Sequence, residues 1–132
     1  ASFMKAQAQE EVGHAMKFYA YVHEQGGRVI LEAIEKPQET FDNPQQIFDL
    51  SLKHEKFVTS RINSLVDLAL EEKDHATKAF LDWFVTEQVE EEASMDSIVN
   101  KFKWVGSSGQ GLLMLDAQLG QRSAPVATTS GE

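Results

Sequence analysis

Apolar residues recur three, four or seven positions apart along three long stretches of this chain. This spacing places them on one face of an α-helix and does not match the two-residue alternation of a half-buried β-strand. A shorter, strongly apolar stretch follows the third one. The sequence therefore predicts an all-α protein with helices at about residues 2–25, 44–72, 74–105 and 110–119.

Each long helix is expected to bury one apolar stripe. In the first helix the stripe consists of Met4, Ala8, Ala15, Phe18 and Val22. In the second helix it consists of Phe48, Leu52, Ile62, Val66 and Ala69. In the third helix it consists of Phe80, Leu81, Phe84, Met95, Ile98 and Phe102. Capping residues mark the helix ends: Gly26 and Gly27, Asn43 with Pro44, and Asp74.

The first and second helices are joined by a long crossover connection, residues 27–43. When extended, a segment of this length reaches ~55 Å, whereas a helix of about 25 residues spans only ~38 Å. The connection is therefore long enough to cross a helical bundle lengthwise. Because Val29, Ile30, Leu31 and Ile34 are apolar, we expect it to pack along that bundle.

Composition narrows the possible functions of a 132-residue chain that suits one compact domain. A formal net charge of −9 disfavours binding to nucleic acids and to anionic membranes. The absence of cysteine leaves only oxygen and imidazole nitrogen as metal ligands. No apolar run reaches the ~20 residues of a membrane span, and the N-terminus lacks a signal-peptide pattern. We expect a soluble, cytoplasmic protein.

Polar residues interrupt all three stripes at positions where apolar residues would be expected. Glu11 lies seven residues from both Met4 and Phe18, and His14 lies one turn later. Glu55 lies seven residues from both Phe48 and Ile62. On the third helix the interrupting residues are Gln88 and Glu91. A buried carboxylate costs several kcal/mol unless it is paired, protonated or bound to a cation.

For a single such residue, a solvated carboxylate or a satisfied core histidine is the favoured interpretation. The coincidence on three helices reverses that preference and indicates a carboxylate-rich metal site inside a helical bundle. A non-catalytic helical scaffold, or a fragment with an incomplete metal site, is the alternative from a different class. In a scaffold the carboxylates should pair with Lys or Arg, but the inner stripes contain no basic residue.

These residues occur within segments by which the chain resembles the prokaryotic non-haem ferritins. The most specific segments are Gly26-Gly-Arg-Val29, Leu52-Lys-His-Glu-Lys56 and Phe80-Leu-Asp-Trp-Phe-Val-Thr-Glu-Gln-Val-Glu-Glu-Glu92. The resemblance implies a ferritin-like four-helix bundle, represented here by its last three long helices and a short C-terminal helix. The family's first helix is then absent, residues 1–122 form the domain, and residues 123–132 form a disordered tail.

The resemblance also implies a ligand set for iron. Glu11 would bridge two irons, His14 would bind the first, and Glu55 with Glu91 would bind the second. Gln88 would contact the side that carries oxygen. Three further acidic residues, together with Glu91, would hold a third iron; solvated acidic faces are the competing interpretation for Glu10, Glu87 and Glu90.

The implied activity is that of a ferroxidase, which oxidises Fe(II) with O2 or hydrogen peroxide and stores Fe(III) mineral in a homo-oligomeric cage of 24 subunits. In such a cage the short helix 110–119 would meet its symmetry mates. Haem-containing bacterioferritins are a further alternative. They carry a Met and a second Glu-x-x-His where this chain has Val12 and Gln88-x-x-Glu91, so no haem is expected.

Overall fold

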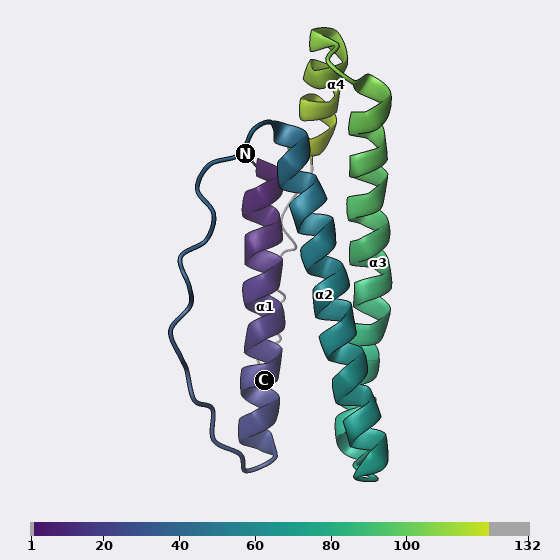
Figure 1. Cartoon of the computed structure of the whole chain (residues 1–132). Helices are drawn as coiled ribbons and strands as arrows, with labels where there is room; N and C mark the ends of the chain where they lie inside the picture. Colours follow the sequence, from purple (N-terminus) through teal and green to yellow (C-terminus); the bar gives the residue numbers. More distant parts are fainter. Residues whose placement is uncertain (1, 122–132) are drawn as a thin grey trace. The chain divides into compact units, whose positions relative to one another are not determined.

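The computed structural model describes residues 2–121 and consists of four helices joined by irregular segments. They are α1 (Ser2–Glu24), α2 (Pro44–Glu71), α3 (His75–Val105) and α4 (Gly109–Gly120), as Figure 1 shows. No strand occurs among the described residues, which confirms the predicted all-α class. The predicted disordered tail, residues 123–132, lies outside the described part.

Residue contacts divide the chain into two compact units. One of them, Gln38–Gly106, holds α2 and α3. The other holds α1, the first part of the crossover connection, and α4. The helices α2 and α3 form a hairpin because only a short turn joins them (Figure 1).

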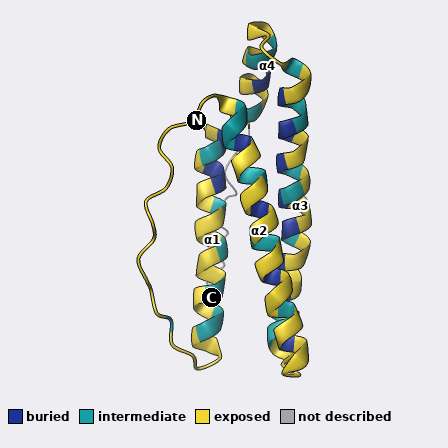
Figure 2. Ribbon diagram, in the orientation of Figure 1, coloured by how far each residue is buried: buried dark blue, intermediate teal, exposed yellow. Residues whose placement is uncertain are grey.

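The core of the α2–α3 unit is formed by the predicted stripes of the two helices. Met95 has no exposed surface, and Leu81 is almost as fully buried. The rings of Phe48 and Phe102 lie 5.2 Å apart between centroids and join the first turns of α2 to the end of α3. Figure 2 shows buried positions recurring along both helices. The remaining buried apolar residues are Ile62, Ala69, Phe84, Ile98 and Val99.

Local hydrogen bonds define the ends of these helices as the sequence predicts. The side chain of Asn43 accepts a hydrogen bond of 2.9 Å from the backbone N–H of Gln46, and Pro44 begins α2. Asp74 accepts one of 3.0 Å from the N–H of Thr77 at the start of α3. At the end of α3, Gly106 has φ 54° and ψ −133°, a conformation that side chains with a Cβ rarely adopt.

In the unit that holds α1 and α4, the buried side chains of α1 lie at one end of that helix. Phe3, Ala6 and Gln7 are buried there, as is Leu115 of α4, and the hydroxyl of Ser2 donates to the carbonyl of Gly120 at 3.5 Å. The prediction of one buried stripe along all of α1 is wrong for its middle turns, where three stripe positions are exposed: Ala8, Glu11 and Ala15. Within this unit α4 has 12 residues against 23 in α1, so it covers only part of the longer helix.

The crossover connection corrects a second prediction. Ile30, Leu31 and Ile34 are exposed, and the exposed fraction of Ile34 reaches 95%. Apolar composition indicates a tendency to be buried, but burial also requires a surface to pack against, and the described chain provides none for these side chains.

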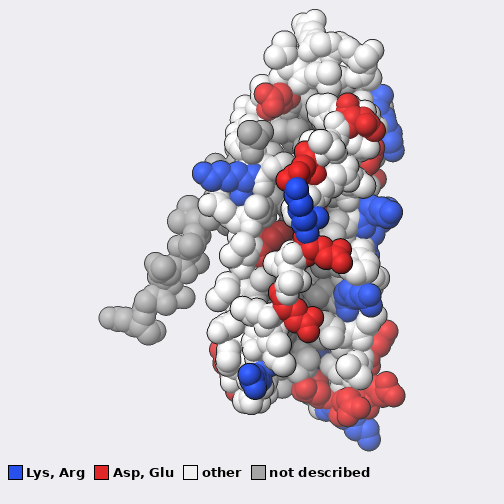
Figure 3. All heavy atoms as spheres, turned by 60° about the vertical axis from the view of Figure 1, so that its left-hand side comes forward, with Lys and Arg blue, Asp and Glu red and all other residues white. Residues whose placement is uncertain are grey.

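The surface is mixed in charge, and no described helix is a membrane span. Acidic and basic side chains are interspersed on the face that Figure 3 draws, consistent with 21 acidic and 12 basic residues. Within residues 2–121, every helix is too short or too polar to cross a membrane.

Candidate metal centre

Two helices of one unit bury three of the predicted site residues. The exposed fractions are 5% for Glu55 on α2, 4% for Gln88 on α3 and 4% for Glu91 on α3. Each lies seven residues from two buried apolar residues of its own helix. It therefore shares their face of the helix and is buried with them. Glu55, Gln88 and Glu91 therefore lie within the core that α2 and α3 form.

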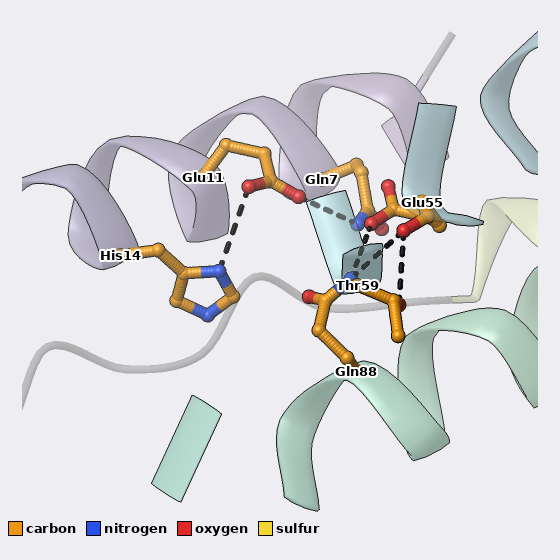
Figure 4. Close-up of polar contacts among 6 residues, drawn as sticks. All are labelled: Gln7, Glu11, His14, Glu55, Thr59 and Gln88. Atoms are coloured by element: carbon orange, nitrogen blue, oxygen red, sulfur yellow. Dashed lines mark hydrogen bonds and ion pairs between the residues drawn. The ribbon is translucent and has the colours of Figure 1, made fainter. Parts of the chain in front are cut away.

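Gln88 connects α3 to α2 through its side-chain amide. Its Nε2 donates toward the backbone carbonyl of Glu55 at 3.2 Å and toward the Glu55 carboxylate oxygen Oε2 at 3.4 Å. The same nitrogen lies 3.2 Å from the hydroxyl oxygen of Thr59 (Figure 4). The predicted pair of Glu55 and Gln88 is thus in direct contact.

Thr59 links this pair to a second carboxylate. Its hydroxyl lies 2.6 Å from Oε1 of Glu92 and 3.0 Å from the backbone carbonyl of Glu55, four residues earlier on α2. Both oxygens accept hydrogen bonds, and the hydroxyl has one proton to donate. Thr59 therefore donates to one of them at a time while it accepts from Gln88.

Within the other unit, α1 brings a predicted carboxylate ligand next to a predicted imidazole ligand. Nδ1 of His14 lies 3.5 Å from Oε2 of Glu11, as expected for residues three positions apart on a helix. Nε2 of Gln7 donates to the other carboxylate oxygen of Glu11 at 3.4 Å (Figure 4). The His14 side chain is 16% exposed and that of Glu11 is 45% exposed.

The three residues predicted for a third iron are less buried than Glu55, Gln88 and Glu91. Glu10 and Glu87 are partly buried and Glu90 is exposed. Among residues 2–121 no three His, Asp or Glu side chains form a group able to hold a metal ion. The structure thus brings together Glu11 with His14 and Glu55 with Gln88, and it places Glu91 in the α2–α3 core.

The chemistry of these groups suits hard or borderline cations. Carboxylate oxygens and imidazole nitrogen are the ligands that divalent iron, manganese and zinc accept in proteins. Carboxylates can also bridge two cations, which a neutral ligand does poorly. The donor types present are consequently those of a carboxylate-rich metal centre.

Three contacting residues were missed by the sequence analysis: Gln7, Thr59 and Glu92. Each lies four residues from a predicted site residue, namely Glu11, Glu55 and Gln88 respectively. Residues four positions apart are neighbours on a helix surface. A search for hydrogen-bonding side chains at that spacing would have found all three.

Comparison with known proteins assigns the family. Residues 1–105 match the ferritin-like domain of the ferritin family. The chain is 38% identical over 123 residues to a probable bacterial non-heme ferritin-like protein of Haemophilus influenzae, covering 93% of this chain and 74% of that one. It is 42% identical over 122 residues to the bacterial non-heme ferritin of Bacteroides fragilis, covering 92% and 76%.

Solved structures agree with the sequence matches. An open pore ferritin from the hyperthermophilic archaeon Archaeoglobus fulgidus is similar to this chain with a TM-score of 0.91 and 48% identity. The match covers 92% of this chain and 75% of that one. The fold predicted from the sequence is thereby confirmed as ferritin-like, and the chain belongs to the ferritin family.

Proposed function

We propose that this protein stores iron and that it binds Fe(II) as substrate at a di-iron centre, where the iron is oxidised to Fe(III). The observation that carries the proposal is the burial of Glu55, Gln88 and Glu91 on the stripes by which α2 and α3 form their core. Membership of the ferritin family, whose members store iron, supports it.

A buried carboxylate is costly unless it is paired, protonated or bound to a cation. Moving an ionised carboxylate out of water carries a penalty of several kcal/mol, even after the protein relaxes. Two carboxylates and an amide occupy buried positions in the apolar stripes of α2 and α3, which favours a functional role. Bound Fe(II) offsets the penalty because its charge is opposite and its preferred ligands include carboxylate oxygens.

Each residue is proposed to have a distinct role. Glu11 bridges the two irons and His14 binds the first; their contact at 3.5 Å supports a shared ligand pair. Glu55 and Glu91 bind the second iron, and Gln88 faces the oxidant. Glu10, Glu87 and Glu90 provide carboxylates for a third iron.

Two irons are needed because the oxidant accepts electrons in pairs. Each Fe(II) loses one electron, and O2 takes both electrons with two protons to leave as hydrogen peroxide. Hydrogen peroxide as oxidant takes two electrons and two protons and leaves as water. The anionic ligands favour the more highly charged Fe(III) product, as expected from Coulomb attraction.

Storage of the product requires a closed assembly, and we propose a homo-oligomeric cage of 24 subunits. Exposed apolar side chains on the crossover connection and on α4, such as Ile34 and Met114, support contact with further copies. The net charge of −9 favours the approach of cations over anions.

The test is a titration of the purified chain with Fe(II) in the absence of oxygen, followed by admission of O2. Absorbance between about 300 and 650 nm follows Fe(III) formation, with about two irons oxidised rapidly per chain in a di-iron centre. The variant Glu55→Gln keeps the size of the side chain and removes its charge, so rapid oxidation should be lost.

The matched control is Glu71→Gln, the same substitution at an exposed position of the same helix. It should oxidise iron like the unmodified chain. Equal rates for Glu55→Gln and the unmodified chain, or no saturable binding of Fe(II) by the unmodified chain, would overturn the proposal and favour a non-catalytic helical scaffold.

A further inference from the structure

We propose that Thr59, held by Glu92, is a positioning residue that orients Gln88 and, through it, the carboxylate of Glu55. The inference rests on the proposed di-iron function. It is carried by an unbroken series of contacts between α2 and α3: Glu92 to Thr59 at 2.6 Å, Thr59 to Gln88 at 3.2 Å, and Gln88 to the Glu55 carboxylate at 3.4 Å.

The proton of the Thr59 hydroxyl has a preferred direction. The two acceptors it faces are a carboxylate oxygen of Glu92 at 2.6 Å and the carbonyl of Glu55 at 3.0 Å. Hydrogen bonds from a hydroxyl to an ionised carboxylate are short, about 2.5–2.7 Å, and roughly twice as strong as neutral ones. The proton therefore points to Glu92, and an oxygen lone pair of Thr59 faces Gln88.

The Gln88 amide can turn either its NH2 group or its oxygen toward Thr59. A lone pair of Thr59 in that position selects the orientation with the NH2 group toward it. The NH2 group can donate to Thr59, whereas the amide oxygen would meet a second acceptor there. The backbone carbonyl of Glu55 only accepts hydrogen bonds, so it selects the same orientation at 3.2 Å. Figure 4 shows the result, with the amide nitrogen facing Thr59 and Glu55 and the amide oxygen directed away from them.

This orientation has two consequences for the proposed centre. The NH2 group faces the carboxylate oxygen Oε2 of Glu55, a proposed iron ligand, at 3.4 Å and favours that position of the oxygen. The amide oxygen of Gln88 is directed away from Thr59 and Glu55 (Figure 4), and in the proposed centre it faces the oxidant. Residues that orient metal ligands through hydrogen bonds typically contribute a factor of about 10–100 in metal affinity or activity.

The experiment compares Thr59→Val, which removes the hydroxyl and keeps the branched shape, with Thr59→Ser, which restores the hydroxyl. The control Thr86→Val makes the same change at an exposed threonine of α3 whose hydroxyl bonds only the preceding turn of its own helix. Three quantities are measured: the rate of Fe(II) oxidation, the visible absorption spectrum of bound Co(II), and the thermal unfolding midpoint.

We expect Thr59→Val to slow oxidation by about 10-fold and to alter the Co(II) spectrum, with both restored in Thr59→Ser and unchanged in Thr86→Val. In a Gln88→Ala background, Thr59→Val should add no further slowing, because its effect passes through Gln88. The thermal unfolding midpoint identifies any variant that is merely less folded. If Thr59→Val is such a variant, recovery of the oxidation rate and of the Co(II) spectrum in Thr59→Ser tests the role of the hydroxyl.

Two results would overturn the inference while the proposed function stands. One is a Thr59→Val chain that oxidises iron and binds Co(II) like the unmodified chain. The other is a Thr59→Val substitution that slows Fe(II) oxidation by the same factor in the unmodified chain and in the Gln88→Ala background. If the unmodified chain neither oxidises Fe(II) nor differs from Glu55→Gln, the proposed function fails, and this inference fails with it.

Discussion

Among single residues, Lys73 is the one non-glycine with a positive φ, 57°, in the described chain. It lies just after α2, where its N–H bonds the carbonyl of Leu70 and that of Asp74 bonds Ala69. This pair of hydrogen bonds is the Schellman motif, in which glycine usually occupies the left-handed position. Lysine there carries a steric cost of about 1–2 kcal/mol, since its Cβ approaches the following carbonyl.

Lys73→Gly should therefore raise the free energy of unfolding, by up to about 1 kcal/mol once the greater freedom of unfolded glycine is subtracted. Urea unfolding followed by circular dichroism measures the change. Lys73→Ala removes the same charge but keeps a Cβ, so it should give no gain. A gain of equal size in the alanine variant would assign the effect to charge instead of backbone strain.

Residue periodicity predicted the burial of Glu55, Gln88 and Glu91, because on a helix a position seven residues from two core residues shares their face. It did not predict which of them meet. The contact between Gln88 and Glu55 depends on the register of α3 against α2 and on side-chain rotamers. The register and the rotamers are properties of tertiary packing, and the spacing of residues within one helix does not predict them.

At the scale of elements, the start of α3 has a pH-dependent cap. Hydrogen bonds from the hydroxyl and then the backbone N–H of Thr77 hold the pKa of Asp74 below its ordinary value. A carboxyl whose pKa is lower in the folded state stabilises the protein above its unfolded-state pKa, about 3.9 for aspartate. That stabilisation is lost as the pH falls through the folded-state value.

We expect the unmodified chain to lose more stability than Asp74→Asn when the pH is lowered from 6 to below about 4, measured as the difference between their thermal midpoints. Asparagine keeps a capping oxygen without a titrating group. Thr77→Val keeps Asp74 but removes the hydroxyl whose hydrogen bond lowers the pKa of Asp74 most, so the stability that it loses should be intermediate. A difference between the chain and Asp74→Asn that is independent of pH would contradict this account.

Sequence reasoning about elements succeeded where the determinants are local. Asn43 and Asp74 cap α2 and α3 as expected, because a cap bonds an N–H only three residues later. It failed for the middle of α1, where Ala8 and Ala15 are exposed. Periodicity predicts which face of a helix is apolar, whereas burial depends on what covers that face.

For the whole molecule, iron binding and folding should be linked. A ligand that binds only the folded state at 100 times its dissociation constant stabilises that state by about 2.7 kcal/mol. Anaerobic Fe(II) should therefore raise the thermal midpoint of the unmodified chain. Glu91→Gln removes a carboxylate that is buried in the core, so the rise in its thermal midpoint should be much smaller than in the exposed control Glu71→Gln. Equal rises in all three would place the bound iron elsewhere.

Assembly is the remaining property of the whole molecule, and Ile34 tests it. Its exposed fraction of 95% means that a charge there removes no packing within the described chain, so Ile34→Asp should leave thermal unfolding of the isolated chain unchanged. If copies cover this side chain in a cage, burying the new carboxylate costs several kcal/mol per subunit, and light scattering should report a smaller particle.

Thr40→Asp is the matched control, because it places the same charge at an exposed polar position of the same connection. It should assemble like the unmodified chain if Ile34 is specifically covered. Equal particle masses for Ile34→Asp and the unmodified chain would exclude this connection from the contacts between copies. Loss of assembly in both variants would instead assign the effect to net charge, since added acidic residues increase repulsion between subunits that each already carry −9.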